Sequence, residues 1–189
     1  HLSILRPLGN PRYYCAPIKS AIDRLKRENI SPSDLASHVR ERTKMLTREK
    51  KTLSLGEYSK RARSLLKLKE LTLMYRSYEE ALRAEHLYDY GDMVMELIKA
   101  LETHPDLLLI LREEYQYILA DEHQDANQSQ NRILELLAGD DADPNLFIVG
   151  DERQAIYQFQ GASLENFLYF SRRFPSARVI ELTDNYRST

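Results

Sequence analysis

Three acidic side chains crowd the end of a short apolar run in the sequence. The segment "YILADEHQD", residues 117–125, passes from four residues that suit a buried strand to Asp121 and Glu122, with Asp125 close behind. Such a pair can hold Mg²⁺ through one carboxylate and waters, while the neighbouring carboxylate orients and deprotonates a water that attacks a phosphate. Alternatively, the acids cap the helix expected near Asn127. Residue chemistry alone leaves both interpretations open.

The elements around these acids predict a parallel sheet. Short runs rich in β-branched and aromatic residues predict strands at residues 115–120, 145–150 and 177–182. Helical segments at residues 127–139 and 163–174 separate the strands; the first ends at a glycine and the second before a proline. This alternation predicts an α/β fold with right-handed crossovers.

Each predicted strand is followed by residues suited to binding. Asp121 and Glu122 end the first strand, Gly150 and Asp151 follow the second, and residues 185–187 (Asn-Tyr-Arg) follow the third. Ligands of open parallel sheets bind at the carboxyl ends of the strands. We therefore expect these groups to meet at one edge, where a metal that carries a nucleotide would relieve the repulsion between the acids.

The chain before residue 114 shows the apolar spacing of helices. A first helix, residues 16–28, carries an apolar stripe made of Ile18, Ala21, Ile22 and Leu25. A second begins after Ser31 as N-cap with Pro32 in its first position, and a third, rich in Leu, Lys, Arg and Glu, spans about residues 56–84. These segments predict helices that pack on one another with solvated basic faces.

Two further helices are expected before the first strand. In residues 88–101, Asp92 is expected to cap a helix. The side chains expected to face inward from this helix are Met93, Leu97, Ile98 and Leu101. Pro105 is expected to open the second, short helix.

Composition narrows the class of protein. The chain has 189 residues, 42% of them hydrophobic, which is enough for a packed core in one sizeable domain or two small ones. Cys15 is its one cysteine, so an internal disulfide and a cysteine-based zinc site are excluded, which suits a reducing cytoplasm. No stretch has the length of a membrane span, and no signal peptide is evident, so we expect a cytoplasmic protein without a membrane partner.

Three strings in this order resemble the second, third and fourth motifs of the UvrD/Rep family of superfamily 1 DNA helicases. They are "ILADEHQD" (118–125), "FIVGDERQAIYQFQGA" (147–162) and "LTDNYRST" (182–189). The resemblance covers residues 85–189 well, and more loosely the helical part, where "AIDRLKRENISP" (21–32) is most similar. It implies a mostly helical insertion subdomain, residues 1–86. Residues 87–189 would then be the C-terminal part of the first RecA-like domain, a parallel-sheet P-loop NTPase domain.

The resemblance also implies an activity and its ligands. The whole protein would be an ATP-dependent DNA helicase, with Mg²⁺ and ATP as cofactors and with single-stranded DNA and duplex junctions as partners. Asp121 would bind Mg²⁺ and Glu122 would activate water. Gln154 would sense the γ-phosphate, and Arg187 would contact it as an arginine finger does.

Other residues of the motifs receive supporting or DNA-binding roles. Tyr157 and Phe159 would stack on bases of single-stranded DNA, because a flat ring can stack on any base. Gln124 and Asp125 complete the second motif, where Asp125 would organise the loop beneath the site, and Asp151 belongs to the third motif. Without the resemblance, core packing is an alternative role for both rings, and a surface salt bridge for Arg187.

The sequence departs from the family in two positions and one motif. His123 stands where the family usually has an aromatic residue, and Gln160 where it usually has arginine. We expect His123 to pack inside, because strand alternation turns it away from Glu122. No G-x-x-x-x-G-K-[ST] phosphate loop occurs in the chain, so the isolated chain is expected to be inactive.

Two other functions remain open from the residues. One is a metal-dependent phosphoesterase that uses Asp121, His123 and Asp125. The other is a noncatalytic nucleic-acid-binding module, in which the basic helices between Arg40 and Lys69 contact phosphates. An ordinary solvated surface is the alternative role for those helices.

Overall fold

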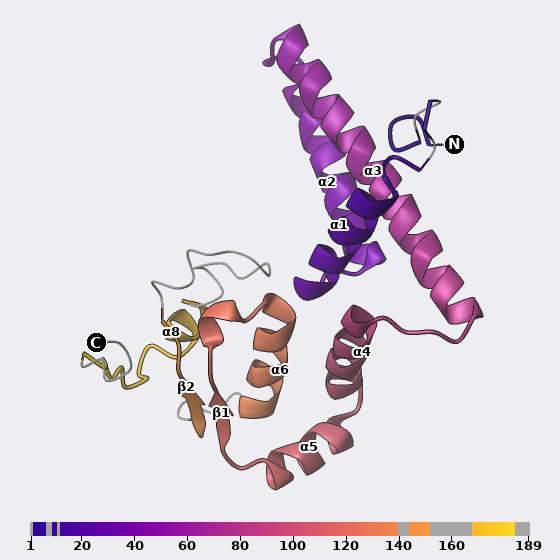
Figure 1. Cartoon of the computed structure of the whole chain (residues 1–189). Helices are drawn as coiled ribbons and strands as arrows, with labels where there is room; N and C mark the ends of the chain where they lie inside the picture. Colours follow the sequence, from indigo (N-terminus) through magenta and orange to yellow (C-terminus); the bar gives the residue numbers. More distant parts are fainter. Residues whose placement is uncertain (1, 7–8, 11, 140–143, 152–167, 184–189) are drawn as a thin grey trace, which may run out of the picture. The chain divides into compact units, whose positions relative to one another are not determined.

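The computed structural model in Figure 1 describes residues 2–6, 9–10, 12–139, 144–151 and 168–183. The chain divides into two compact units, residues 1–100 and 101–189. Helix α4 (Tyr90–Thr103) contains the point of division. The functional division into subdomains 1–86 and 87–189 stays a prediction.

The first unit is built from helices with well-defined starts. These are α1 (Cys15–Arg27), α2 (Pro32–Glu49), α3 (Leu55–Ala84) and the greater part of α4. Ser31 and Ser54 cap α2 and α3, and each accepts a hydrogen bond from the backbone N–H of the third helical residue. The expected cap at Ser31 and the long third helix are confirmed, and α2 and α3 lie side by side as a helical hairpin (Figure 1).

A small apolar core joins the first three helices. Ile22 of α1, Leu35 of α2 and Tyr75 of α3 are buried together. Ile18 and Leu25, from the predicted stripe, pack against this cluster. The Tyr75 hydroxyl donates a hydrogen bond to the Ile30 carbonyl at 3.2 Å, so the ring satisfies its polar atom while its body fills the core.

A buried cation joins α1, α3 and the start of α4. Lys26 is 1% exposed, and its Nζ lies 2.7 Å from Glu79, 2.7 Å from Asp89 and 2.6 Å from Asp92. Burial by itself lowers the pKa of Lys26, but hydrogen bonds to Asp89, Asp92 and Glu79 outweigh burial and raise the pKa. A Cβ on Gly91 would lie 2.7 Å from Lys26 Cδ, so the lysine stem needs glycine there.

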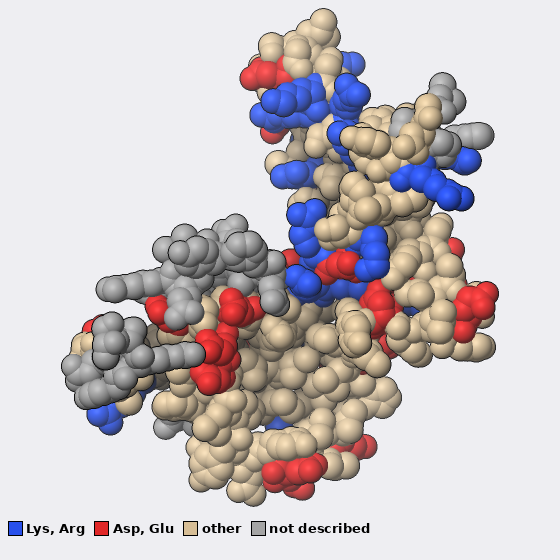
Figure 2. Space-filling model, viewed as in Figure 1, with Lys and Arg blue, Asp and Glu red and all other residues tan. Residues whose placement is uncertain are grey.

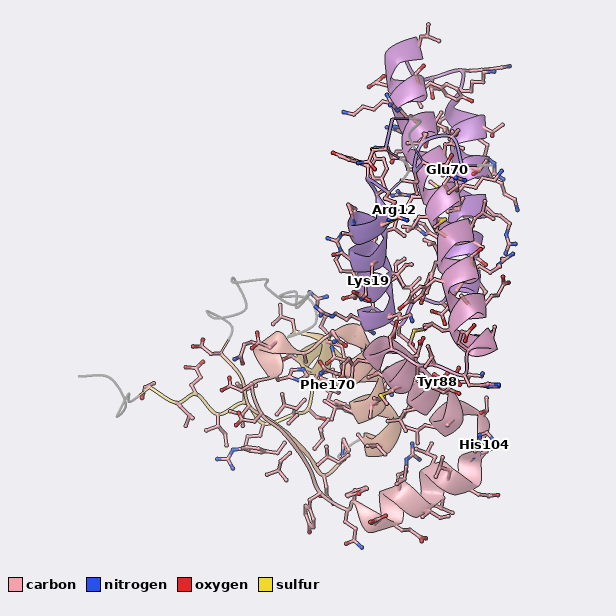
Figure 3. The ribbon with its side chains drawn as sticks, turned by 45° about the vertical axis from the view of Figure 1, so that its right-hand side comes forward. Arg12, Lys19, Glu70, Tyr88, His104 and Phe170 are labelled. Carbon is pink, nitrogen blue, oxygen red and sulfur yellow. The ribbon has the colours of Figure 1, made fainter. Side chains whose placement is uncertain are left out.

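The N-terminal segment is held by a single carboxylate on α3. Glu70, labelled in Figure 3, is 3% exposed and accepts hydrogen bonds from the backbone N–H groups of Ser3, Ile4 and Leu5. The Ser3 hydroxyl donates another bond at 2.6 Å. Burial opposes ionisation of Glu70, but these bonds outweigh it and lower its pKa to about 2.

The start of α4 differs from the predicted one. Asp89 accepts the N–H of Asp92 at 2.9 Å, and Asp92 accepts the N–H of Asp89 at 3.1 Å. Asp92 therefore lies inside the helix, and the prediction that it caps the helix is wrong by about one turn. Ile98 and Leu101 are buried as expected, but Met93 and Leu97 are exposed, whereas Asp92, which pairs with Lys26, is buried.

The second unit holds a small parallel sheet. Its elements are α5 (Pro105–Glu114), β1 (Ile118–Ala120), the 3-10 helix η1 (His123–Asp125), α6 (Gln128–Ala138), β2 (Leu146–Ile148) and α8 (Tyr169–Arg173). Strands β1 and β2 pair in parallel, with Ile118 opposite Leu146. Helix α6 ends at Gly139, whose φ of 82° suits glycine. The alternation is confirmed over β1, α6, β2 and α8, and the helix start at Pro105 is confirmed as well.

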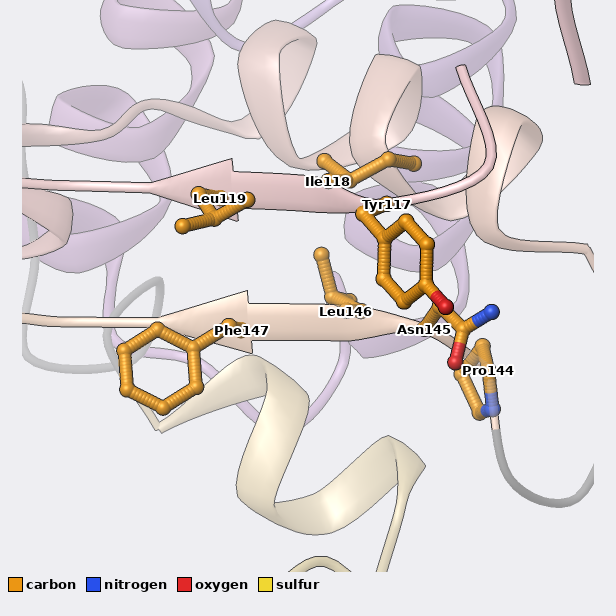
Figure 4. Close-up of a pocket in the computed structure, with 7 residues that line it drawn as sticks. All are labelled: Tyr117, Ile118, Leu119, Pro144, Asn145, Leu146 and Phe147. Atoms are coloured by element: carbon orange, nitrogen blue, oxygen red, sulfur yellow. The ribbon is translucent and has the colours of Figure 1, made fainter. Parts of the chain in front are cut away.

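One face of the sheet is open. Along both strands, partly buried residues alternate with exposed ones, so Leu119 is 75% and Phe147 55% exposed (Figure 4). The predicted third strand, residues 177–182, does not form, and Val179, Ile180 and Leu182 are exposed. A strand is stable only when a neighbouring strand pairs with its backbone, and no strand of the described residues pairs with this segment.

Part of the predicted pattern falls outside the described residues. The helix expected at residues 163–174 is described from residue 168 onward, where α8 ends before Pro175 as predicted. Within the described part of the chain, no helix is both long and apolar enough to cross a membrane.

Candidate active site

The chain turns sharply where it leaves β1. Glu122 follows directly after Asp121 and adopts φ 50° and ψ 36°, the left-handed region that non-glycine residues rarely occupy. Residues held in such conformations often belong to functional sites. The turn leads into η1, which carries Gln124 and ends at Asp125.

Hydrogen bonds join the segments that follow the two strands. The Val149 N–H donates to the Ala120 carbonyl at 2.8 Å, and the His123 N–H donates to the Val149 carbonyl at 2.9 Å. The Asp151 N–H then donates to Gln124 Oε1 at 3.0 Å. The expected meeting of the first two strand ends is therefore confirmed, since Asp121 and Asp151 leave adjacent parallel strands at the same edge.

The two leading carboxylates are exposed but differ in their contacts. Asp121 Oδ1 accepts the N–H of Glu122 at 2.8 Å. Glu122 Oε2 accepts a hydrogen bond from Gln124 Nε2 at 2.6 Å. A side-chain donor therefore orients the Glu122 carboxylate, whereas the Asp121 carboxylate is bonded to the backbone of the next residue.

The donor set fits a magnesium ion bound together with a nucleotide. Mg²⁺ in such sites takes one or two carboxylates, waters and phosphate oxygens. Asp121 is an exposed carboxylate at a strand end, and it has a second oxygen, Oδ2, in addition to the one that accepts the Glu122 N–H. Among the described residues, no group of three or more His, Cys, Asp or Glu side chains forms a metal cage.

Helix α6 does not depend on these acids for its cap. Asn127 Oδ1 accepts the N–H of Gln130 at 3.1 Å, and Gln130 Oε1 accepts the N–H of Asn127 at 3.0 Å. This reciprocal pair is a complete capping box. The alternative in which the acids cap this helix is therefore wrong.

His123 points into the protein. It is 2% exposed, and its ring packs edge-on against Phe170 of α8 with the ring centroids 5.3 Å apart. Burial lowers the pKa of the imidazole, which favours its neutral form. The packing role predicted for His123 is confirmed, and an exposed metal site shared with Asp121 and Asp125 is disfavoured.

Several predicted site residues lie outside the described part of the chain. They are Gln154, Tyr157, Phe159, Gln160, Asn185, Tyr186 and Arg187. Asp125 is described and exposed, and its N–H donates to the Glu122 carbonyl at 3.0 Å. Sequence reasoning assigned Gln124 only to its motif. The position of Gln124 two residues after Glu122 could have suggested that the two side chains interact. The hydrogen bond between Gln124 and Asp151 could be found only from the structure.

Two other surface features involve none of the residues at this strand-end edge. The hollow in Figure 4 is lined by residues 117–119 and 144–147, toward the starts of β1 and β2, and its lining is largely apolar. The helices of the first unit carry many Lys and Arg side chains (Figure 2). On α3, Lys60, Arg63 and Lys67 are exposed and share one helical face because they are three and four residues apart.

Comparison with known proteins places these motifs in context. The family model described as the UvrD/REP helicase N-terminal domain matches residues 11–175. Proteins named ATP-dependent DNA helicase PcrA are similar over 116 residues, 61% of this chain: 38% identical in Bacillus subtilis and in Staphylococcus epidermidis, and 36% in Leuconostoc citreum. The chain spans 15–16% of the length of these relatives.

Proposed function

Because the chain belongs to the UvrD/REP helicase family, we propose that it is part of an ATP-dependent DNA helicase that hydrolyses Mg-ATP to move along single-stranded DNA. The observation that carries the proposal is the position of Asp121, Glu122 and Asp151 at the carboxyl ends of adjacent parallel strands. This edge is where open α/β sheets bind nucleotides. Residues 87–189 would belong to a RecA-like motor domain and residues 1–86 to its helical insertion.

The two carboxylates divide the chemistry. Asp121 would hold Mg²⁺, which supplies charge neutralisation on the phosphate oxygens. Glu122, exposed and oriented by Gln124, would accept the proton of the water that attacks the γ-phosphate. Glu122 directly follows Asp121, so the proposed base and the proposed metal ligand are neighbours in the chain at this turn.

The family motifs suggest further roles for residues outside the described segments. Gln154 and Arg187 would contact the γ-phosphate, and Arg187 would stabilise the charge of the transition state. Tyr157 and Phe159 would stack on DNA bases. Duplex junctions would be the substrate of unwinding, and the protein would act in the cytoplasm.

The test is Mg²⁺-dependent ATP hydrolysis by the full-length protein, with and without single-stranded DNA, together with strand separation of a tailed duplex. Wild type should show DNA-stimulated turnover and unwinding. Asp121→Ala should weaken Mg-ATP binding, whereas Asp106→Ala, an exposed acid of α5, is the matched control and should behave as wild type. Absence of both activities in the wild-type protein would contradict the proposal.

A second candidate function is noncatalytic binding of nucleic acid by the first unit. The observation that favours it is the exposed basic face formed by Lys60, Arg63 and Lys67 on α3. Replacing all three by Glu should weaken DNA binding uniformly across sequences and reduce its salt dependence. If the salt dependence is unchanged, this face is an ordinary solvated surface.

A further inference from the structure

Gln124 occupies a buried position between two exposed acids of the motif. Its side chain is 2% exposed, while Glu122 and Asp125 on either side of it are exposed. A buried primary amide costs free energy unless its donor and acceptor are both bonded. The hydrogen bonds of the Gln124 amide therefore explain why its side chain can be buried.

The amide bonds in two directions at once. Its Nε2 donates to Glu122 Oε2 at 2.6 Å, a short hydrogen bond to a charged acceptor. Its Oε1 accepts the backbone N–H of Asp151 at 3.0 Å, on the segment that follows β2. One side chain thus connects the carboxylate after β1 with the backbone after β2, and its bond to Asp151 spans 27 residues of the chain.

The chemistry of the residue fits this task closely. A primary amide carries a donor and an acceptor on one short planar group, so it can serve a carboxylate and an N–H together. A glutamate at this position would keep the acceptor for Asp151 but set a carboxylate against Glu122. A methionine of similar length would lose both bonds and leave the Asp151 N–H without this acceptor.

We propose that Gln124 is a positioning residue that holds the Glu122 carboxylate in its working orientation and fixes the segment after β2 to it. This inference rests on the proposed function, since Glu122 is the water-activating base there. Gln124 itself contacts neither nucleotide nor metal in this assignment. Its loss should therefore lower kcat for ATP hydrolysis much more than it raises KM for Mg-ATP.

The kinetic test compares Gln124→Met and Gln124→Glu with wild type in the full-length protein. Both variants should lower kcat by about tenfold or more, because small misplacements of a catalytic group cost that much or more, while KM changes little. Gln116→Met and Gln116→Glu, at an exposed position of the same unit, are matched controls and should keep wild-type kinetics. Unchanged kcat in both Gln124 variants, or a loss confined to KM, would overturn the positioning role.

A second measurement tests the link itself without relying on catalysis. Hydrogen–deuterium exchange resolved at the Asp151 amide should be about tenfold faster in Gln124→Met, the change expected for one typical hydrogen bond. Gln124→Glu should retain most of the protection because its oxygen can still accept the N–H. Equal exchange in wild type and Gln124→Met would overturn the link. Absence of ATPase activity in the wild-type protein would instead refute the proposed function. The exchange experiment would still show whether Gln124 binds the Asp151 N–H.

Discussion

Glu122 and His123 are neighbours in the chain, yet their side chains lie in opposite environments. The left-handed turn at Glu122 presents its carboxylate at the surface, and η1 then carries the His123 ring inward against Phe170. Sequence alternation predicted the opposite orientation of the two side chains, but not the turn that enforces it. Because Glu122 has a side chain, the positive φ costs free energy that packing of His123 and the bonds of Gln124 must offset.

At the residue scale, the rings of the third motif give a direct prediction about DNA. Replacing Tyr157 or Phe159 by Ala in the full-length protein should weaken single-stranded DNA binding by roughly 1–3 kcal/mol each, because a stacked base loses its platform. The loss should be similar for different DNA sequences. Binding is measured by fluorescence anisotropy, with circular dichroism to verify folding. If the variants unfold while affinity per folded molecule is unchanged, the rings belong to the core.

At the scale of elements, the buried Lys26 holds three helices together. Lys26→Met should destabilise the 189-residue chain by about 3–5 kcal/mol, because Glu79, Asp89 and Asp92 would lose their shared cation. Lys19→Met is the matched control on the same helix (Figure 3), exposed and paired only with Asp23 among the ion pairs of the described residues. Its effect should lie within about 0.5 kcal/mol. Urea unfolding measures both, and equal effects would show that the buried cluster contributes nothing.

The carboxylate of Glu70 makes the attachment of the N-terminal segment sensitive to acid. Its pKa is about 2, below the ordinary value of 4.5, so its contribution to stability is complete above pH 4.5 and declines as pH falls toward 2. Glu70→Gln should therefore lower the free energy of unfolding at pH 7, and the difference from wild type should shrink as the pH falls from 4.5 toward 2. Glu80→Gln, at an exposed position of α3, is the control. A difference independent of pH would exclude the ionised carboxylate as the cause.

Local signals predicted the helices better than the sheet. Ser31 with Pro32, and the glycine after α6, mark boundaries through their own backbone chemistry, so they could be read from the sequence. The start of α4 was misplaced because Asp89 and Asp92 can both cap a helix by residue type, and both also pair with Lys26 of α1, far away in the sequence. Such long-range contacts have no local signature.

The prediction of a third strand was wrong for a related reason. Residues 177–182 have the composition of a strand, but a strand also needs a partner at its edge, which composition does not supply. In the candidate site, the alternation of strands and helices predicted that the carboxyl ends of the first two strands meet at one edge. The connection between Gln124 and Asp151 could not be predicted, because it depends on the register of β1 against β2.

At the scale of the whole molecule, the chain corresponds to a small part of its relatives in the UvrD/REP helicase family. It spans 15–16% of the length of the relatives that it matches, and its sequence contains no phosphate loop. The isolated 189-residue chain should therefore show no Mg²⁺-dependent ATP hydrolysis above background, since nothing would cradle the phosphates. The measurement is phosphate release with and without single-stranded DNA. Sustained turnover that disappears in Glu122→Ala would contradict this expectation and favour the phosphoesterase alternative.

The division of roles between Asp121 and Glu122 is the central claim, and Glu122→Gln in the full-length protein tests it most directly. The amide can still bond the water but cannot accept its proton, so kcat should fall by about 10²–10⁴-fold while affinity for a nonhydrolysable Mg-ATP analogue stays close to that of wild type. Glu114→Gln, an exposed residue before β1, is the matched control and should leave both quantities unchanged. Near-normal turnover in Glu122→Gln, or a loss of Mg-ATP affinity as large as that of Asp121→Ala, would contradict the claim.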